Sequence, residues 1–367
     1  MKLPKNAFTI YPKTLPMHSR LSKHLISTDA SLLEAFARLD ALATDLDLFA
    51  VNASQQLVGS ITDGDLRRGI VGGARLDDTV QKIMHSPCSY LQQNDLDLRF
   101  IKQQRHRGIK ALPIVNEDHK VVDILNFRKR KTLLPLDVVI MAGGKGTRLL
   151  PLTLDTPKPL LPVADKPIID YNRQRIQQFA AGTITISVNY LKEQLQVYAQ
   201  QVSTEEAPVR CVEEPEPLGT IGALSLVSEW QHNYILLTNS DLLTTIDYED
   251  FFLNFIDSKA DMMVAAIPYP VKIPYAILEV EQNHVRAFRE KPEYTYYANT
   301  GIYLLKNEIL SMIPVNQPFD TTDLMDHLLE SGKKLAYYPM VAYWLDIGKP
   351  DDYKKAQDDI QHLNFDG

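Results

Sequence analysis

The spacing of apolar residues changes near residue 131. Within 167–181, Ile169, Ile176 and Phe179 recur on one side, which predicts a helix. Short apolar or β-branched runs predict strands at 137–142, 183–188, 234–238, 262–267, 276–280 and 301–305. Because these strands alternate with helices, we expect an α/β domain whose mostly parallel sheet is covered on both faces. Ligands of such sheets lie beyond the carboxyl ends of the strands.

The chain before residue 131 follows one plan twice. Each copy has a helix, a short strand at 49–51 or 111–115, a polar turn, a second strand and then a helix or turn. A copy of about 60 residues is marginal alone, so we expect the two copies to pair as an α+β unit. The predicted boundaries are 1–130 for the N-terminal segment with its copies (about 17–75 and 79–130), 131–136 for a linker and 137–367 for the second domain.

The first copy brings two polar side chains to the start of a helix. An apolar strand at 57–61 is followed by Thr62 and Asp65. This pattern resembles a cystathionine-β-synthase (CBS) domain, and the resemblance implies an adenine nucleotide at Thr62 and Asp65. The second copy has Leu125 and Arg128 at the corresponding positions, which puts ligand binding by that half in doubt. A pair kept for folding, dimerisation or positioning is the alternative.

Composition narrows the functional classes. The 367 residues are 45% hydrophobic and 23% charged, as in an ordinary globular protein, and their number favours more than one domain. The net charge is −7, so the chain lacks the broad positive field that nucleic acid requires. The basic run at 128–131 lies where a linker is expected. We interpret this run as a hinge and do not expect a nucleic acid as partner.

Cysteine use and hydropathy predict the compartment. Cys88 and Cys211 lie far apart in the sequence, so no disulfide framework is indicated, as in a reducing cytoplasm. Residues 1–16 contain no apolar signal core, and no run of about 18 apolar residues occurs. We therefore expect a cytoplasmic protein with no membrane partner.

A glycine-rich loop follows the strand at 137–142. Its residues are Ala142, Gly143, Gly144, Lys145, Gly146 and Thr147, with Arg148 directly after them. The glycines let backbone N–H groups turn toward a triphosphate, because no β-carbon blocks a close approach. Lys145 and Arg148 add positive charge. The spacing fits neither a Walker A loop nor a dinucleotide-binding motif, so kinase-like and dehydrogenase functions are disfavoured.

A proline-rich segment at 156–163 carries Lys158. Its prolines stiffen the backbone, so Lys158 is presented to a phosphate at low entropic cost. The loop and this segment together resemble the signature of nucleoside-diphosphate-sugar pyrophosphorylases, the sugar-1-phosphate guanylyl-, thymidylyl- and uridylyltransferases. The resemblance covers 137–367 and implies a Rossmann-like nucleotide-diphospho-sugar transferase fold. It also implies an enzyme that joins a nucleoside triphosphate to a sugar 1-phosphate.

An acidic stretch is the next motif of this family. The resemblance implies that Glu213, Glu214 and Gly219 touch the base and the sugar. Guanine offers two adjacent N–H donors, which a carboxylate accepts, so Glu213 or Glu214 favours GTP. A thymidylyl- or uridylyltransferase, using dTTP or UTP, is the rival enzyme. A solvated acidic turn is the non-functional alternative for either glutamate.

The resemblance implies a metal site and a sugar site at two further motifs. Asp241 and Asp346 each follow an apolar run, and by resemblance they hold Mg²⁺, which needs few carboxylates besides phosphate oxygens and water. A turn or helix cap is the alternative for each. By the same resemblance Lys291 binds the sugar phosphate, while Glu290 and Asn299 contact sugar hydroxyls. A surface ion pair and a turn before a strand are the alternatives for these residues.

The implied chemistry needs no general base, because a sugar phosphate is already ionised at about pH 7. Its oxygen would attack the α-phosphorus in line while pyrophosphate leaves, helped by positioning and charge neutralisation. Arg148 and Lys158 are the predicted cations for the triphosphate and the transition state, with Lys145 as a weaker candidate. Asp241 completes the predicted catalytic set.

The order of an N-terminal CBS pair and a transferase resembles the glucosamine-1-phosphate guanylyltransferases of legionaminic acid synthesis. The implied product is GDP-glucosamine, while mannose 1-phosphate and a heptose phosphate stay open as substrates. The alternative from another class is a catalytically silent, nucleotide-sensing regulatory subunit. Such proteins lose the metal aspartates or the loop arginine, whereas this chain keeps Arg148, Asp241 and Asp346. By resemblance we also expect a homo-oligomer.

Overall fold

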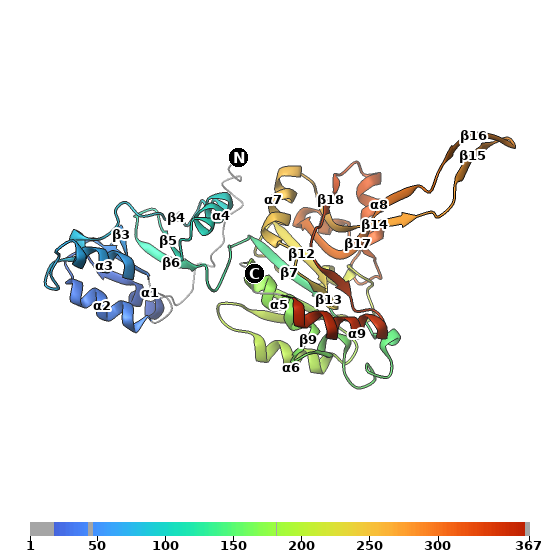
Figure 1. Cartoon of the computed structure of the whole chain (residues 1–367). Helices are drawn as coiled ribbons and strands as arrows, with labels where there is room; N and C mark the ends of the chain where they lie inside the picture. The colour runs from blue at the N-terminus through green and yellow to red at the C-terminus, as the bar shows by residue number, and fades with distance from the viewer. Residues whose placement is uncertain (1–17, 43–46, 181, 364–367) are drawn as a thin grey trace. The chain divides into compact units, whose positions relative to one another are not determined.

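A computed structural model of the chain describes residues 18–42, 47–180 and 182–363. The chain forms two compact units (Figure 1). Unit 1 comprises Met1–Pro135 with Gln178–Ala181, and unit 2 comprises Leu136–Gln177 with Gly182–Gly367. Within the described residues, no helix is both long enough and apolar enough to cross a bilayer.

Unit 1 contains two sheets of the same topology. In the first, β1 (Leu25–Ser27) pairs in parallel with β2 (Asp47–Val51), which pairs antiparallel with β3 (Leu57–Thr62). In the second, β4 (Leu91–Gln92), β5 (Ala111–Val115) and β6 (Val121–Asn126) repeat this order and these directions. The helices of the unit are α1 (His18–His24), α2 (Leu32–Ala41), α3 (Asp63–Val71), the 3₁₀ turn Val80–Lys82 and α4 (Leu98–His106).

The two copies bury a common core. Phe49, Val51 and Leu57 of the first copy pack with Val115 and Val121 of the second. The backbone N–H of Leu57 also donates to a carbonyl of the second copy, that of His119, at 2.9 Å. Each sheet is too small to bury its apolar face alone. The two copies therefore share one apolar core, whereas their assignment as a CBS pair stays a prediction.

Unit 2 is built on one seven-stranded sheet, in the order β11-β10-β7-β12-β17-β14-β18. Only β17 runs antiparallel to its neighbours, β12 and β14, so the predicted α/β fold with a mostly parallel sheet is confirmed. The strands are β7 (Leu136–Met141), β10 (Ile184–Val188), β11 (Val209–Glu213), β12 (Tyr234–Asn239), β14 (Met262–Lys272), β17 (Glu293–Lys306) and β18 (Leu335–Pro339). Small two-stranded sheets pair β8 (Pro162–Val163) with β9 (Lys166–Pro167), and β13 (Leu242–Thr244) with β19 (Trp344–Asp346).

Helices bury apolar side chains against this sheet. On α8, Leu324 and Leu328 pack with Val139 of β7 and Leu237 of β12. The helices are α5 (Ile168–Gln177), α6 (Lys192–Val202), α7 (Tyr248–Ser258), α8 (Thr321–Glu330) and α9 (Pro350–Asp359). The 3₁₀ turns are Thr147–Leu149, Lys158–Leu160, Gly222–Leu226, Asn307–Met312 and Ile360–His362. The helix predicted for 167–181 ends at Gln177, and residue 181 lies outside the described residues.

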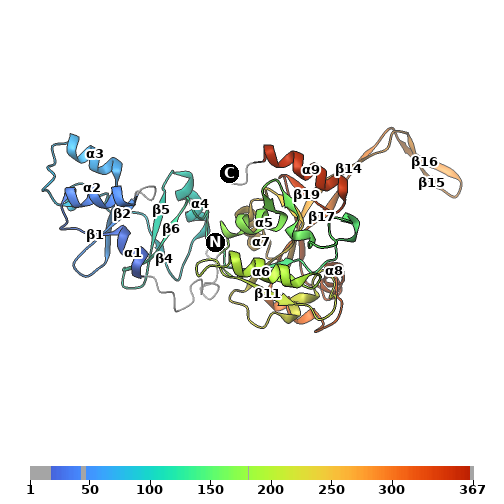
Figure 2. The same ribbon diagram turned by 90° about the horizontal axis from the view of Figure 1, so that it is seen from below.

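Two strands are much longer than their apolar runs predict. β14 and β17 stay paired beyond the sheet, from Ala266↔Asn299 to Lys272↔Glu293. They lead into the hairpin of β15 (Ile277–Glu281) and β16 (His284–Arg289), which extends away from the rest of unit 2 in both views (Figures 1 and 2). We call residues 268–297 the arm. The strand predicted at 276–280 therefore lies in the arm hairpin and not in the main sheet.

Candidate active site

The glycine loop and Asp241 begin at the same edge of the sheet. β7 and β12 are parallel neighbours whose last paired residues are Met141 and Asn239. The N–H of Ser240 donates to the carbonyl of Met141 at 3.2 Å. Parallel strands bring their carboxyl ends together, which is where ligands of such sheets bind. The edge at these two strand ends is therefore the natural place for a site.

Backbone pairing brings the two distant aspartates together. β13 starts directly after Asp241, and β19 ends with Asp346. In the antiparallel ladder Leu242 lies opposite Asp346, and the N–H of Ile347 donates to the carbonyl of Asp241 at 3.0 Å. The placement of both carboxylates is thus determined by main-chain hydrogen bonds.

Cations surround this carboxylate pair. Lys158, only 9% exposed, forms an ion pair with Asp241. A β-carbon at Gly348 would lie 3.6 Å from Asp346 Oδ1 and 3.7 Å from a terminal nitrogen of Arg148, so these two side chains are close. Burial raises the pKa of Asp346, the charge of Asp241 raises it further, and Lys158 and Arg148 lower it. The four charged groups therefore interact electrostatically at one site.

The aspartates each keep one oxygen without a donor. Asp241 Oδ1 and Asp346 Oδ1 are buried and have no hydrogen-bond partner among the residues that the structure describes. Buried acceptors are normally satisfied, so two orphaned carboxylate oxygens at one site fit an oxygen-binding cation. No group of three or more His, Cys, Asp or Glu that fits a metal occurs in the described ranges. This donor set suits Mg²⁺, which commonly takes one or two carboxylates and completes its shell with phosphate oxygens and water.

Two glycines of the loop are required by close packing. Gly146 has φ +61°, and a β-carbon there would lie 3.0 Å from Thr153 Cγ2 and 3.1 Å from Lys158 Cβ. A β-carbon at Gly143 would lie 2.7 Å from a carboxylate oxygen of Glu214. Gly144, in contrast, has open space around its α-carbon. The loop therefore closes onto Lys158 and Glu214 at these two points.

The remaining loop residues divide into one anchor and three exposed side chains. Ala142 is buried, and its N–H donates to the carbonyl of Ser187 at 3.1 Å. Lys145, Thr147 and Arg148 are exposed to solvent. The loop thus carries two exposed cations, of which Arg148 lies near Asp346 and Lys145 faces solvent.

Helix α5 supports the segment that follows Asp241, a role that sequence reasoning missed. The side-chain amide of Asn172 donates to the carbonyl of Leu242 at 2.7 Å. Arg175 Nε donates to the carbonyl of Ile246 at 3.0 Å. Both side chains are buried, although polar residues on a helix usually face water. Their only sequence signal was polar residues within the apolar spacing of 167–181.

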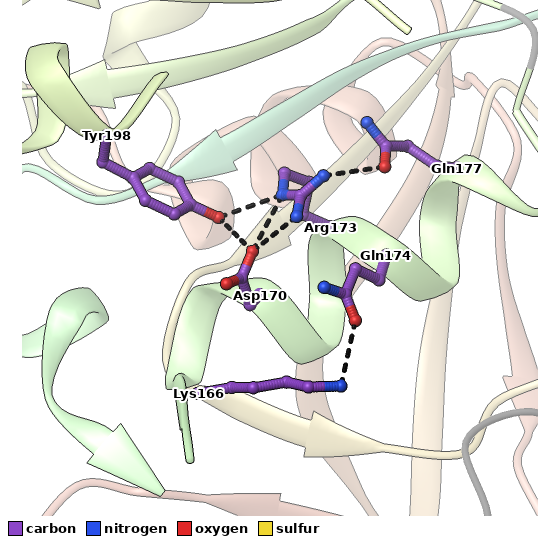
Figure 3. A network of polar contacts seen from close by, with 6 residues as sticks. All are labelled: Lys166, Asp170, Arg173, Gln174, Gln177 and Tyr198. Atoms are coloured by element: carbon purple, nitrogen blue, oxygen red, sulfur yellow. Dashed lines mark hydrogen bonds and ion pairs between the residues drawn. The ribbon is translucent and has the colours of Figure 1, made fainter. Parts of the chain in front are cut away.

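A buried polar network ties α5 to α6 (Figure 3). Asp170 Oδ1 accepts from Arg173 at 2.6 Å and from the hydroxyl of Tyr198 at 2.7 Å. Arg173 also donates to the side chain of Gln177 at 2.8 Å. Burial raises the pKa of Tyr198, and its hydrogen bond to Asp170 raises it further, so the phenol stays protonated. This network stabilises the helix that carries Asn172 and Arg175.

The predicted base-site residues lie in different environments. Glu214 is 5% exposed, lies beside Gly143, and accepts from the N–H of Leu218 at 3.0 Å. Glu213 is exposed and forms an ion pair with Lys192. Glu214, and not Glu213, thus lies against the glycine loop.

Gly219 is held against the loop that precedes α8. Its φ is +76°, and a β-carbon would lie 2.7 Å from the carbonyl oxygen of Phe319. The N–H of Thr220 donates to Asp320 at 2.9 Å. This close backbone approach explains why glycine stands at position 219.

Asn299 lies next to the carboxyl end of β12. Its side-chain oxygen accepts from the N–H of Gly301 at 3.0 Å, and its amide donates to the hydroxyl of Tyr303 at 2.9 Å. Gly301 itself packs on Asn239, since a β-carbon there would lie 2.5 Å from that side-chain amide. Asn299 is therefore at the same edge as Asp241, which follows Asn239 by two residues.

The structure does not bring Glu290 and Lys291 to this edge. Both are exposed and lie on the arm, between β16 and β17. β17 runs uninterrupted in its ladder from Glu293 to Asn299, a distance of roughly 20 Å at about 3.4 Å per residue. Lys291, two residues before Glu293, therefore lies far along the arm from Asn299.

In unit 1 the predicted ligand residues form a helix cap. The Thr62 hydroxyl donates to Asp65 Oδ2 at 2.6 Å and accepts from the N–H of Asp65 at 3.2 Å. The second oxygen of Asp65 accepts from Arg68 at 2.6 Å. This reciprocal arrangement is a capping box at the start of α3. Both side chains thus have a structural role, and binding of an adenine nucleotide stays a prediction.

Comparison with known proteins identifies the family to which the chain belongs. The model of the family described as "Nucleotidyl transferase" matches residues 137–362. The chain belongs to the nucleotidyl transferase family. The family predicted from the motifs is thereby confirmed, and this nucleotidyltransferase has relatives named as guanylyltransferases. The CBS pair stays a prediction.

Three similar proteins illustrate the relationship. "Probable mannose-1-phosphate guanylyltransferase 2" of Arabidopsis thaliana is 32% identical over 232 residues, which are 59% of this chain and 63% of that protein. "D-glycero-alpha-D-manno-heptose 1-phosphate guanylyltransferase" of Aneurinibacillus thermoaerophilus is 29% identical over 236 residues, with 62% and 99% covered. The crystal structure of HddC from Yersinia pseudotuberculosis is 28% identical and covers 61% of this chain and 99% of its own, with a TM-score of 0.47. The chain thus spans less than two thirds of the first relative.

Proposed function

We propose that this nucleotidyltransferase joins GTP to a sugar 1-phosphate and releases pyrophosphate, with Mg²⁺ as cofactor. The observation that carries the proposal is the pair Asp241 and Asp346. Each has a buried oxygen without a donor, and the pair lies beside Lys158 and Arg148 at the edge where the glycine loop starts. Carboxylates for a metal and cations for phosphates are the groups that nucleotidyl transfer requires.

The residues of the chain act by positioning and by charge. A sugar phosphate oxygen attacks the α-phosphorus of the nucleotide, a new P–O bond forms, and the bond to the leaving pyrophosphate breaks. The attacking group is already an anion, so no base has to remove a proton. Lys158, buried against Asp241, and Arg148, exposed beside Asp346, would neutralise the triphosphate and the charge of the transition state. When bound by Asp241 and Asp346, Mg²⁺ would neutralise phosphate oxygens.

Glu214 is the better candidate for recognition of guanine. Its carboxylate lies against Gly143 of the loop, whereas Glu213 is engaged by Lys192 at the surface. A carboxylate accepts from the two adjacent N–H donors of guanine. The names of the Arabidopsis and Aneurinibacillus relatives, both guanylyltransferases, also support GTP. A thymidylyl- or uridylyltransferase is the rival function.

For the sugar we propose glucosamine 1-phosphate, in a pathway to legionaminic acid. Support comes from the order of a repeat-containing N-terminal unit and a transferase unit. Mannose 1-phosphate and manno-heptose 1-phosphate are the alternatives, and the names of the relatives favour them. A silent sensor that binds adenine nucleotide at Thr62 and Asp65 is the non-enzymatic alternative, against which the complete set of Arg148, Asp241 and Asp346 argues.

The test is pyrophosphate release by the purified full chain with Mg²⁺. GTP, UTP, dTTP, CTP and ATP are each combined with glucosamine, mannose, manno-heptose, glucose and N-acetylglucosamine 1-phosphates. We expect the highest kcat/KM for GTP with glucosamine 1-phosphate. A higher kcat/KM with dTTP or UTP would contradict the proposed guanine specificity. A higher kcat/KM with another sugar phosphate would contradict the proposed glucosamine 1-phosphate. No release by protein with a folded circular dichroism spectrum would contradict the enzymatic function.

A further inference from the structure

The arm exposes an unusual amount of apolar surface. Nine of the 22 large hydrophobic side chains that are exposed among the described residues lie within 268–297. Phe288 is 70% exposed and Tyr275 is 75% exposed. The other seven are Tyr269, Val271, Leu278, Val280, Val285, Tyr296 and Tyr297. Apolar surface gathered in this way on one element is typical of an interaction site.

The ribbon that carries this surface is supported by the rest of unit 2 only near its base, where the ring of Tyr297 lies 4.8 Å from that of Tyr337 on β18. Ala266 is the last residue of β14 that pairs with β18, and from Ile267↔Ala298 to Lys272↔Glu293 the ribbon consists of β14 and β17 alone, followed by the hairpin of β15 and β16. A two-stranded ribbon is marginally stable in water, and both of its edges have free backbone groups. The arm therefore needs a protein surface that covers its side chains.

Charge on the arm singles out two residues. Three ion pairs, Lys272–Glu293, Arg286–Glu281 and Arg289–Glu279, engage the other acidic residues and the other lysine and arginines of the arm. Glu290 and Lys291 have no ion pair among the described residues. Lys291 also adopts φ +43°, a strained conformation for a residue with a side chain. Unpaired charges on a strained turn are expected where a ligand or partner completes them.

The chain's own site is out of reach of this lysine. The paired ladder places Glu293 roughly 20 Å from Asn299 along β17, whereas an extended lysine side chain spans only about 6 Å. Seven consecutive paired positions, 266–272 with 293–299, leave no irregularity at which the ribbon would fold back. A sugar phosphate bound near Asp241 therefore needs its arm residues from elsewhere.

We propose that the arm docks on a second copy of this chain and supplies Lys291, with Glu290 beside it, to the sugar-phosphate site of that copy. The inference rests on the proposed function, because it concerns the same substrate. A second copy is the partner that these features fit best, since it offers both a site that lacks these two charges and an arm of its own. With two-fold symmetry each arm serves the other copy, so both sites of the dimer are completed.

The test pairs two inactive variants in one dimer. Asp241→Asn removes a metal ligand but keeps a normal arm, and Lys291→Ala does the reverse. The two chains are co-expressed with different tags, and the mixed dimer is isolated by successive affinity steps. If each arm serves the other chain, the Lys291→Ala chain keeps its Asp241 and receives a normal arm, so the mixed dimer has one complete site. We then expect about half of the wild-type turnover, although either homodimer is nearly inactive. If each arm served its own chain, the mixed dimer would be as inactive as the homodimers.

A reciprocal dimer gives the opposite pattern. It pairs the wild type with the double variant Asp241→Asn/Lys291→Ala. If each arm serves the other chain, this dimer has no complete site and is inactive. If each arm serves its own chain, the wild-type chain keeps its site and about half of the activity remains. Asp346→Asn replaces Asp241→Asn if the latter fails to fold. A monomeric wild type in light scattering, or full activity of the Lys291→Ala homodimer, would overturn the proposal. Failure of the proposed function is distinguishable, because the wild type itself would then release no pyrophosphate.

Discussion

The sheet edge and the arm both carry predicted site residues, but Lys158 and the two aspartates at the edge are partly or fully buried, whereas the residues on the arm are exposed. At the edge, Asp241 and Asp346 are fixed by a backbone ladder, and Lys158 is buried against one of them. On the arm, Glu290 and Lys291 are exposed on a ribbon of two strands. Groups held at the edge are preorganised, which is what catalysis requires. Groups on the arm are available for exchange with another surface.

The largest effect is expected from breaking the proposed metal-binding pair, Asp241 and Asp346. Asp241→Asn removes one of two carboxylates with an orphaned oxygen, so turnover should fall by a factor on the order of 10³ or more. The thermal unfolding midpoint should change little, because the substitution loses the ion pair with Lys158 but also removes the repulsion between the charges of Asp241 and Asp346. Asp358→Asn, at an exposed position of α9, is the matched control and should be fully active. Steady-state pyrophosphate release measures both, and an active Asp241→Asn would remove the metal assignment.

The second prediction compares two lysines near the site. Lys158→Met removes the buried cation that pairs with Asp241, and we expect a loss in kcat of about 10². Lys145→Met removes an exposed cation of the glycine loop, and a loss of no more than about threefold is expected because solvent screens its charge. An equal loss of kcat in the two variants would contradict the idea that the buried lysine contributes more to catalysis than the exposed one.

The third prediction uses the two kinds of glycine in the loop. Gly146→Ala introduces a β-carbon at φ +61° that contacts Lys158 Cβ at 3.1 Å, so we expect a roughly 30-fold loss of kcat, equivalent to about 2 kcal/mol. Gly144→Ala meets no atom within 4 Å and should retain most of the activity. The ratio of the two kcat values tests whether the loop is positioned by its contact with Lys158.

The smallest effect on folding is expected on the arm. Phe288→Ser removes an apolar side chain that is 70% exposed, so the free energy of unfolding measured at low protein concentration should change by less than about 0.5 kcal/mol. Self-association should weaken by about tenfold, because the buried area in the dimer decreases. Val341→Ser, at a 99% exposed position outside the arm, is the control and should change neither quantity. Sedimentation equilibrium at several concentrations gives the dissociation constants.

The sequence predicted the edge better than the arm, for a physical reason. The strands 137–142 and 234–238 are buried and apolar, so their runs nearly match β7 and β12. The aspartates that follow strands were expected near the carboxyl edge, where the structure places them. β14, in contrast, is buried only over its first five residues, and its exposed remainder contains Pro268 and Pro270, which normally argue against a strand interior. The continuation of this strand beyond the main sheet was therefore not evident from the sequence.

Buried polar residues were missed for a related reason. Asn172 and Arg175 bind backbone carbonyls behind the site, yet in the sequence they look like solvent-exposed positions of a helix. Thr62 and Asp65 show the converse, because a ligand motif and a capping box use the same residue types at the same spacing. Local sequence does not distinguish these cases, since the partner atoms come from distant segments or from the helix start itself.

The most direct test of the central claim is pyrophosphate release from GTP and a sugar 1-phosphate by the wild-type chain as Mg²⁺ is titrated from zero in chelated buffer. If Asp241 and Asp346 hold the catalytic metal, the rate is at background without a divalent cation and rises to saturation with Mg²⁺. In Asp241→Asn the saturating rate stays low. An equal wild-type rate with and without the chelator would contradict the account.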